Sequence, residues 1–397
     1  MAKKTVEDLR DLSGARVFVR VDFNVPLDDG RITDDTRITA ALPTLRRLIA
    51  GRAKVVLASH LGRPKKGPDP ALSLLPAAQR LSELLGQPVA MAGDCVGPEV
   101  KRMAAALAGG DVLMLENVRF HEEEEANDTD FARRLVADTG TTIFVNDAFG
   151  TAHRAHASTE GVSHHVDTSV AGLLMDKELR FLGMAVEGKE RPFVAILGGA
   201  KVSDKIQVIE SLLPRVDALL IGGGMAYTFL RASGAPTGRS LVEEDKVEFA
   251  RGLMSRAAGK IHLPVDHVVA SAFKEDAERR TLPADQMPEG WMGLDIGPET
   301  ARSFGAEVRK ARIVLWNGPM GVFEMKPFAE GTLAIARALA ESDGTTVVGG
   351  GDSVAAITQM GLAGRIDHVS TGGGASLEFL AGDPLPGVAC LQDKQDK

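Results

Sequence analysis

The sequence contains little cysteine: Cys95 and Cys390 are the only two among its 397 residues. Two thiols so far apart do not form a disulfide framework, and we expect both to be buried and free. The first residues, MAKKTVEDLR, are charged and lead into no apolar segment, so no signal peptide is expected. No apolar run approaches the roughly 20 residues that a membrane-spanning helix needs. These absences predict a soluble, cytoplasmic protein.

Positive charge is not in excess either. The formal net charge is -8 at pH 7 and the sequence pI is about 5.7, so we expect neither nucleic acid nor a membrane surface as a partner. The acidic run Glu122–Glu125 is interpreted as a solvated face. Nothing in the sequence requires an oligomer, and a monomer is expected. Because domains commonly have about 100–200 residues, the length predicts two of them.

Two common nucleotide-binding signatures are missing. The sequence has no G-x-x-x-x-G-K-[ST], which excludes a P-loop NTPase. No strand-like run is followed by G-x-G-x-x-G with an acidic residue at the expected distance, which argues against a dinucleotide-dependent dehydrogenase. We also find no Asp or His base paired with a nucleophile.

Short apolar runs rich in β-branched residues alternate with helix-like stretches. Near-continuous apolar strands between helices predict an α/β protein with parallel sheets covered by helices on both faces. The runs are Arg16–Val21, Val55–Ser59, Val112–Leu115 and Ile143–Asn146 in the first half, and Phe193–Leu197, Ala218–Ile221, Val265–Ala270, Ile313–Trp316, Thr346–Val348 and Ile366–Val369 in the second. Ligands of such sheets bind beyond the carboxyl ends of the strands.

A linking helix is predicted between the two halves. Leu179, Leu182 and Val186 recur at helical spacing, and we expect the helix to stop near Gly188. The predicted divisions are an N-terminal domain over 1–174, a linker helix over 175–191, a C-terminal domain over 192–383 and a tail over 384–397. We hypothesise that the linker is a hinge.

Polar side chains follow the strand-like runs of the first half. They are Asp22, Phe23 and Asn24 after the first run, His60, Leu61, Gly62 and Arg63 after the second, Arg119 after the third and Arg154 after the fourth, with Arg37 near a helix start. A single arginine is most simply a surface residue. Four arginines at one sheet edge favour a small polyanion instead, since the guanidinium fork matches phosphate and carboxylate.

Glycines follow the strand-like runs of the second half. The clusters are Gly198-Gly199, Gly222-Gly223-Gly224, Gly318 with Gly321, Gly349-Gly350-Gly351 and Gly372-Gly373-Gly374. Glycine lets backbone N–H groups approach a ligand closely, and a following helix favours phosphate at its N-terminus. One pair is usually a turn, whereas five clusters indicate a nucleotide cradle.

Three further side chains of this half are candidates for chemistry. If Lys201 opens a helix, it shares a face with Lys205, and an anion between them relieves their repulsion. Asp352 is a candidate ligand for Mg²⁺, which binds one or two carboxylates together with phosphates. It is also a candidate N-cap for a helix beginning at Ser353. Glu324 could accept hydrogen bonds from ribose hydroxyls.

These motifs together resemble the phosphoglycerate kinase family over nearly the whole chain. The matching segments are RVDFNVP, SHLGRP, LENVRF, NDAFGTAHRAH, RPFVAILGGAKVSDKI, WNGPMGVFE, GGGDS and STGGGASLE, in the family's order. VDFN stands where many members have ADFN, which changes no reacting group. The resemblance implies two similar-sized Rossmann-like domains joined by a hinge helix, with the C-terminal tail returning to the first domain.

The resemblance also implies reversible transfer of the γ-phosphoryl of ATP to the carboxylate of 3-phosphoglycerate, with Mg²⁺, in glycolysis and gluconeogenesis. The implied phosphoglycerate residues are Asp22, Phe23, Asn24, Arg37, His60, Leu61, Gly62, Arg63, Arg119 and Arg154. The implied nucleotide residues are Lys205, Gly293, Asn317, Glu324, Gly350, Gly351, Asp352 and Ser353. The phosphoryl group would be stabilised during transfer by Arg37, Lys201, Lys205, Gly351 and Gly374. This stabilisation would come about when the domains close.

This chemistry explains why no general base is found, because a carboxylate nucleophile is already ionised at neutral pH. Two alternatives remain. One is a kinase that forms an acyl phosphate from a different acid, and the other is an inactive relative that binds nucleotides or anions.

Overall fold

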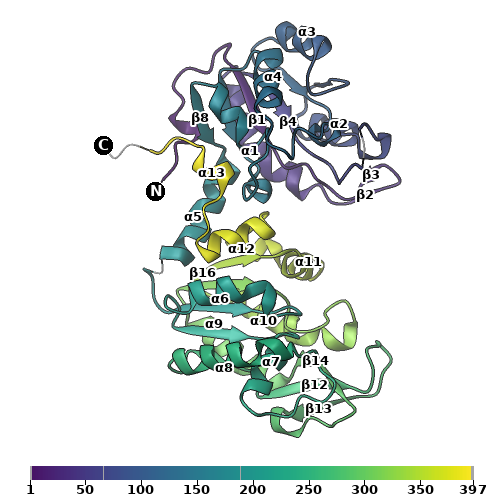
Figure 1. Cartoon of the computed structure of the whole chain (residues 1–397), viewed down its shortest axis with the longest axis vertical. Coiled ribbons are helices and arrows are strands. Elements are labelled where there is room, and N and C mark those ends of the chain that lie inside the picture. The colour runs from purple at the N-terminus through teal and green to yellow at the C-terminus, as the bar shows by residue number, and fades with distance from the viewer. Residues whose placement is uncertain (1, 66, 188, 395–397) are drawn as a thin grey trace. The chain divides into compact units, whose positions relative to one another are not determined.

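A computed structural model describes residues 2–65, 67–187 and 189–394 of the chain (Figure 1). The chain folds into two compact units, one formed by Met1–Leu179 with Pro384–Lys397 and the other by Arg180–Asp383. The division falls within helix α5 (Leu173–Glu187). The predicted end of this helix near Gly188 and the last three residues of the predicted tail lie outside the described residues.

The first unit is built on a six-stranded parallel sheet in the order β5-β6-β4-β1-β7-β8. Its strands are β1 (Arg16–Arg20), β4 (Lys54–Ala58), β5 (Val89–Met91), β6 (Val112–Met114), β7 (Ile143–Asn146) and β8 (Thr168–Ala171). Its helices are α1 (Thr36–Ala50), α2 (Leu75–Leu85), α3 (Pro98–Ala106), α4 (Thr129–Thr139) and α13 (Pro386–Ala389), and a short hairpin joins β2 (Leu27–Asp28) to β3 (Arg31–Ile32).

The second unit contains another six-stranded parallel sheet, in the order β11-β10-β9-β15-β16-β17. Its strands are β9 (Phe193–Leu197), β10 (Ala218–Ile221), β11 (Ile261–His262), β15 (Ile313–Asn317), β16 (Thr345–Gly349) and β17 (His368–Val369). Its helices are α6 (Ile206–Leu212), α7 (Ala226–Ala232), α8 (Val247–Arg256), α9 (Pro298–Lys310), α10 (Glu330–Ala340), α11 (Gly351–Gln359) and α12 (Gly374–Ala381).

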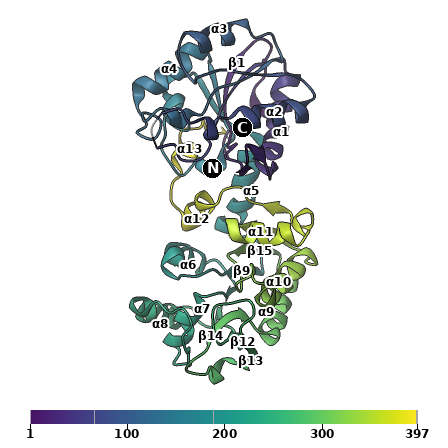
Figure 2. The ribbon, with the colours of Figure 1, turned by 90° about the vertical axis from the view of Figure 1, so that its right-hand side faces the viewer.

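Helices cover both faces of each sheet, as Figure 2 shows for each unit separately. In the first unit α1 and α2 pack on one face and α3 and α4 on the other. The strands are near-continuous apolar segments because both faces are buried: all five residues of β9 and of β15 are buried. The prediction of an α/β fold with two parallel sheets is confirmed.

One predicted strand lies in an antiparallel sheet and not in a parallel one. The run Val265–Ala270 forms β12 (Asp266–Ala270), which lies in a separate antiparallel sheet between β13 (Arg279–Pro283) and β14 (Met292–Ile296). Its apolar pattern does not distinguish a parallel from an antiparallel neighbour, so the prediction of a place in the parallel sheet is wrong. The sequence prediction also missed the short edge strands β5, β8 and β11, whose two to four residues give little pattern.

The C-terminal segment pairs with the N-terminal segment inside the first unit. Lys3 forms an antiparallel bridge with Asp393, and the Lys4 N–H donates to the Gln392 carbonyl over 2.8 Å. The side-chain amide of Asn146, at the end of β7, donates to the Gly387 carbonyl over 2.8 Å. Residues of the tail therefore contribute directly to the first unit.

Both cysteines are free, with Cys95 buried and Cys390 half-buried, so the prediction of free thiols is confirmed. Among the helices of the described residues, none is long and apolar enough to cross a membrane.

Candidate active site

The strand ends of the first unit bring the predicted polar residues together. Because β1 and β4 are parallel neighbours, the loops that follow them meet at one edge of the sheet. The Gly62 N–H donates to the Asn24 side-chain oxygen over 2.8 Å, and the Phe23 N–H donates to the Ser59 hydroxyl over 2.8 Å. These bonds fix the two loops to each other and place Asp22 near His60.

Two arginines join this cluster from other elements. Arg37, in the first turn of α1, pairs with the Asp22 carboxylate. Arg119 donates to the Gly62 carbonyl over 2.9 Å, and its Nε lies 3.1 Å from a Glu125 carboxylate oxygen. The structure thus connects side chains that the sequence places about 100 residues apart.

The remaining two arginines are less firmly held. Arg154 lies close enough to Arg119 for their charges to repel, and its Nε is 3.1 Å from the His153 Nε2. Arg63 is exposed, next to Gly62, and makes no hydrogen bond or ion pair within the described part of the chain. The first unit therefore carries a concentrated positive region with Arg63 at its periphery.

A buried ionic network lies beneath this cluster, and sequence reasoning missed it. Arg20, the last residue of β1, is fully buried and donates to the Ser158 hydroxyl over 2.7 Å. The same hydroxyl donates to Glu124 over 2.6 Å, and Glu124 is fully buried. The interpretation of Glu122–Glu125 as a solvated face is wrong for Glu124. Its carboxylate is buried because the Ser158 hydroxyl connects it to Arg20, which is far away in the sequence.

The network also fixes the protonation of His60. An Arg20 guanidinium nitrogen lies 3.2 Å from His60 Nδ1, and a guanidinium can only donate. Nδ1 must therefore accept, and a neutral imidazole then carries its proton on Nε2. Burial, followed by the charges of Arg20, Arg119 and Arg37, lowers the pKa of His60 well below its usual range. His60 is a neutral hydrogen-bond donor through Nε2.

This assignment gives a spectroscopic prediction. In ¹⁵N-labelled protein we expect His60 to show an unprotonated Nδ1 and a protonated Nε2, with no titration midpoint near the ordinary value of about 6.5. A His60→Gln sample assigns the signals by their disappearance. Protonation at Nδ1, or a midpoint near the ordinary value, contradicts the role given to Arg20.

The glycine clusters of the second unit serve two purposes. Some permit the strand-end loops to pack on each other: a Cβ on Gly223 would lie 2.6 Å from the Gly199 carbonyl oxygen, and one on Gly198 would lie 2.6 Å from the Gly318 carbonyl oxygen. Other glycines face open space or a cavity, as Gly351 and Gly373 do. Close loop packing therefore explains part of the clusters, and a ligand cradle stays a prediction for the glycines that face open space.

A cavity of about 520 Å³ opens beside these loops. Predicted residues in its lining are Gly293, Glu324, Asp352 and the cluster glycines Gly199, Gly223, Gly224 and Gly321; further lining residues include Tyr227, His267, Leu294, Asp295, Met320 and Val322. Its apolar walls with a few polar groups suit a planar, partly apolar ligand. Gly293 is essential to this shape, because a Cβ there would overlap the Tyr227 hydroxyl.

Three buried polar groups of the lining were not predicted from the sequence. The Tyr227 hydroxyl lies 3.2 Å from His267 Nδ1. Burial raises the pKa of Tyr227, lowers the pKa of His267 to about 4 and raises the pKa of Asp295 to about 8. Asp295 accepts from the Gly331 N–H over 2.7 Å, so it also anchors the start of α10. Isolated in the sequence, these residues carry no motif that could have identified them.

The two candidate lysines do not share a helical face. Lys201 is exposed and precedes the short 3-10 helix η6 (Ser203–Lys205), while α6 begins only at Ile206. The prediction that Lys201 opens a helix is wrong, because Glu243 accepts hydrogen bonds from the Val202 and Ser203 N–H groups and holds this turn in another conformation.

Lys205 is buried and donates to the Asn317 side-chain oxygen at the end of β15. Burial lowers the pKa of Lys205 to about 8, although the nearby Asp204 and Asp352 carboxylates favour its charged form. Asn317 presents its other side-chain atom, Nδ2, buried and without a partner among the described residues. Lys205 and Asn317 are therefore brought together, whereas Lys201 remains separate and exposed.

The loop after β16 places the remaining candidates at the start of α11. Gly350 is the N-cap, with φ of 90°, so the prediction of Asp352 as N-cap is wrong. Asp352 lies in the first turn, exposed, and Gly351 is exposed beside it. The Ser353 hydroxyl accepts from the Gly318 N–H over 2.6 Å and so connects two strand-end loops. Gly374 is exposed at the start of α12, after Gly373 with φ of 50°.

The family model and the curated relatives that match this chain all belong to one family. The phosphoglycerate kinase family model matches residues 6–383. A phosphoglycerate kinase of Moorella thermoacetica is 59% identical, covering 99% of this chain and 100% of the relative, and one of Chloroherpeton thalassium is 57% identical with the same coverage.

Solved structures agree. Phosphoglycerate kinase from Coxiella burnetii superposes with a TM-score of 0.88 at 40% identity, covering 98% of each chain. The enzyme from Pyrococcus horikoshii OT3 superposes with a TM-score of 0.85 at 37% identity and the same coverage. With the sequence match spanning nearly its full length, the chain belongs to the phosphoglycerate kinase family.

Proposed function

We propose that this chain transfers the γ-phosphoryl group of ATP to the carboxylate of 3-phosphoglycerate, reversibly, giving ADP and 1,3-bisphosphoglycerate in glycolysis and gluconeogenesis. The observation that carries the proposal is the separation of two ligand sets. The first unit gathers arginines and a neutral histidine at its strand ends, and the second gathers Lys205, an exposed carboxylate and a cavity beside its glycine loops.

The first set fits a small acid that carries a phosphate. Arg63, Arg119 and Arg154 supply positive charge, and His60 supplies a neutral donor. Asp22 and Asn24 can accept from or donate to the acid's hydroxyl, while Phe23, Leu61 and Gly62 shape the loops that hold them. An acid without the distal phosphate leaves these arginines unpaired, so it should be a poor substrate.

The second set fits the nucleotide. The cavity between Gly293 and the loop of Glu324 accepts the base and ribose, and Gly350, Gly351, Asp352 and Ser353 lead the phosphates along the start of α11. Lys205, oriented by Asn317, faces the same loop, since its charge interacts with Asp352.

Transfer needs no general base, because the attacking carboxylate is ionised at neutral pH, with a pKa near about 4 in model acids. The barrier comes from repulsion between two polyanions. Positioning and positive charge lower it, and we propose Arg37, Lys201, Lys205 and the N–H groups of Gly351 and Gly374 for this role. The exposure of Lys201 leaves its side chain free to reach the moving group.

Mg²⁺ is part of the proposal. Asp352 fits it: the carboxylate is exposed, lines the cavity, and has no hydrogen-bond partner within the described residues. Magnesium commonly takes one or two carboxylates and fills its other positions with phosphate oxygens and water. When bound, the ion neutralises phosphate charge beside Asp352.

Replacing Asp352 with asparagine should raise the Mg²⁺ concentration that gives half-maximal rate, by about tenfold or more, since the ion loses its charged protein ligand. The measurement is the initial rate as a function of Mg²⁺ at fixed ATP. Asp343→Asn, at another exposed carboxylate of the same unit, is the matched control. It should require the same Mg²⁺ concentration for half-maximal rate as the parent. An unchanged Mg²⁺ dependence in Asp352→Asn excludes this ligand.

Gly293→Ala should raise the KM for ATP by about tenfold or more, and it should also lower the free energy of unfolding by about 1–3 kcal/mol, the usual cost of overpacking. The new methyl displaces Tyr227 into the cavity, where it occupies the space of the ligand. Gly290→Ala is the control, because a Cβ at Gly290 meets nothing within 4 Å. Equal KM values in the two variants contradict the placement of the nucleotide.

The proposal includes closure of the two domains, 1–174 and 192–383, about the linker 175–191 when both ligands are bound. Closure expels water and brings the acceptor to the phosphoryl group. Small-angle X-ray scattering should show a smaller radius of gyration with both ligands than with either alone. No compaction in the doubly liganded state removes closure from the proposal.

The direct test is a coupled assay of ATP with 3-phosphoglycerate, with and without Mg²⁺, and with glycerate in place of phosphoglycerate. Turnover that requires the phosphorylated acid supports the proposal. A folded chain without turnover supports an inactive relative, and preference for another acid supports a different acyl-phosphate-forming kinase. We further propose that the chain acts in the cytoplasm, because both substrates are small soluble molecules. We also propose that it is a monomer, and light scattering measures the mass that tests this.

A further inference from the structure

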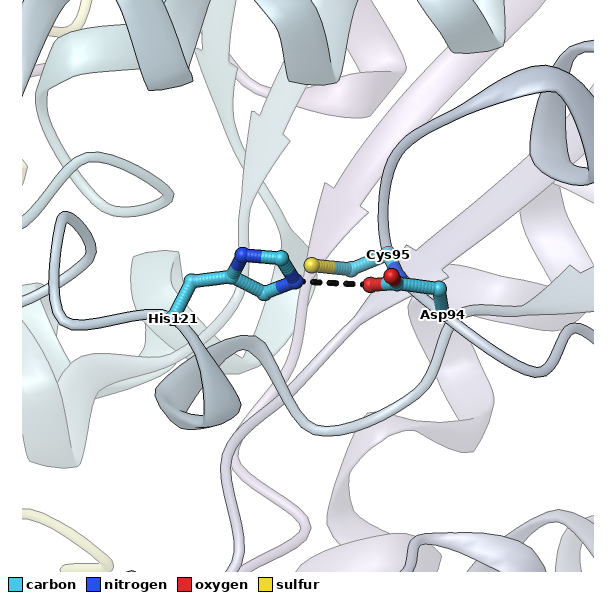
Figure 3. Close-up of side chains that lie close together, drawn as sticks. All are labelled: Asp94, Cys95 and His121. Atoms are coloured by element: carbon cyan, nitrogen blue, oxygen red, sulfur yellow. Dashed lines mark hydrogen bonds and ion pairs between the residues drawn. The ribbon is translucent and has the colours of Figure 1, made fainter. Parts of the chain in front are cut away.

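Three metal-ligating side chains converge in the first unit, outside the site described above (Figure 3). Asp94 and Cys95 follow β5, and His121 follows the 3-10 helix η3 (Val118–Phe120) beyond β6. Since β5 and β6 are parallel neighbours, their loops meet at the same edge of the sheet. One donor atom from each residue, a carboxylate oxygen, a sulfur and a ring nitrogen, lies within 4.8 Å of the other two.

The arrangement is that of a ligand set, not of a nucleophile with its base. In a cysteine–histidine–acid triad, the thiol and the carboxylate contact opposite nitrogens of the imidazole. Here the Asp94 Oδ1 lies 2.7 Å from His121 Nε2. Figure 3 shows the Cys95 sulfur beside the same end of the ring. Sulfur, nitrogen and oxygen therefore point toward one common position.

The surroundings hold these side chains in place. The His121 ring stacks on Phe131 of α4, with centroids 5.0 Å apart and planes inclined by 28°. The Cys95 N–H donates to Asp94 Oδ1 over 2.6 Å. Cys95 is buried, whereas the Asp94 side chain is 50% exposed, so an ion can enter from solvent on the aspartate side and keep a water in a fourth position.

We propose that Asp94, Cys95 and His121 bind one borderline divalent transition metal, of the class of Zn²⁺ or Co²⁺. Bond lengths of about 2.0–2.3 Å put the ligand atoms of a tetrahedral zinc about 3.3–3.8 Å apart. The Asp94 Oδ1 and His121 Nε2 atoms, now 2.7 Å apart, must therefore separate slightly as an ion replaces the hydrogen bond between them, while all three ligand atoms already lie within 4.8 Å of one another. Binding exchanges the thiol proton for the metal: the S–H bond breaks, a sulfur–metal bond forms, and the proton leaves to solvent. The His121 ring, whose Nε2 donates to the Asp94 carboxylate in the metal-free protein, must carry its proton on Nδ1 instead, so that the Nε2 lone pair is free for the metal. Mg²⁺ binds sulfur poorly, so this site is chemically distinct from Asp352.

The test is a titration of the reduced full-length protein with Co²⁺ alone, without nucleotide or Mg²⁺. We expect a thiolate-to-cobalt absorption band that saturates at one equivalent per chain and disappears when Zn²⁺ is added. Cys95→Ser should abolish the band. Cys390→Ser is the matched control, because it removes the only other thiol, and it should leave the band unchanged.

His121→Ala and Asp94→Asn, at partly exposed positions, should each weaken cobalt binding by about tenfold or more, and they carry the test even if Cys95→Ser fails to fold. Zn²⁺ should also raise the unfolding midpoint of the parent and of Cys390→Ser, and it should raise that of His121→Ala by less. The proposal is overturned if the parent shows no band, or if Cys390→Ser abolishes the band. It is also overturned if His121→Ala and Asp94→Asn both bind cobalt as tightly as the parent.

Discussion

Replacing Arg37 with alanine should lower kcat by about 10²–10³-fold, the usual cost of removing one donor from a developing transition state. Arg37 is the arginine of the first unit that we propose for this role. It lies in the first turn of α1, its side chain is 36% exposed, and Asp22 orients it without burying its charge. The KM for phosphoglycerate should also rise, since in the proposed site the same guanidinium neutralises the bound acid.

The control for Arg37 is Arg46→Ala on the same helix. Arg46 is exposed and donates to the Leu84 carbonyl over 3.2 Å, away from the strand-end cluster. Arg46→Ala should unfold within about 0.5 kcal/mol of the parent, as most surface substitutions do, while Arg37→Ala should lose more stability, because the largely buried Asp22 carboxylate loses its partner. Steady-state kinetics and urea denaturation separate the cases. An Arg37→Ala enzyme with parental kcat excludes this residue from the transfer step.

Replacing Glu124 with glutamine should lower the free energy of unfolding by about 3–5 kcal/mol, the usual loss when a buried charge is left uncompensated. Glutamine keeps the shape, but the Arg20 guanidinium then stays buried without the carboxylate that the Ser158 hydroxyl connects to it. Burial raises the pKa of Glu124, while Arg20 and the Ser158 hydrogen bonds oppose this effect by favouring its ionised form. The ionised form of Glu124 is therefore stabilised by Arg20 and Ser158 and not by water.

Urea denaturation of Glu124→Gln beside Glu122→Gln makes the comparison direct, because Glu122 is the exposed neighbour in the same acidic run. Glu122→Gln should differ from the parent by no more than about 0.5 kcal/mol. A loss below about 1 kcal/mol in Glu124→Gln means that Arg20 finds other compensation. In that case the tautomer of His60 should also be re-examined, since Arg20 sets it.

Sequence patterns predicted the sheets well because parallel strands buried on both faces are continuous apolar runs. The ends of such strands locate the ligand edge, which explains why His60, Arg119 and the glycine loops could be selected without a structure. The six-residue run that became β12 shows the limit of this reasoning. It contains Asp266 and His267 and is therefore more polar than the neighbouring runs, but this difference does not reveal its partners, which the course of the chain decides.

What the sequence could not predict depends on contacts between distant segments. Arg20 is one charged residue at the end of a strand, and Glu124 is one of four consecutive acidic residues. Their burial follows from Ser158, more than thirty residues beyond Glu124, which bridges them. The turn of Lys201 is likewise set by Glu243, about forty residues away. Local periodicity contains no information about such partners.

In the proposed reaction the acceptor is a carboxylate, which attacks without a protein base. We suggest incubating the enzyme with ATP, Mg²⁺ and 3-phosphoglycerate labelled with ¹⁸O in its carboxyl group, and recording the ³¹P spectrum of the product. We expect an acyl phosphate whose signal is shifted by a bridging ¹⁸O, with unlabelled ADP. A phosphate ester on the hydroxyl group of the acid, or an acyl phosphate without bridging label, contradicts the proposed reaction.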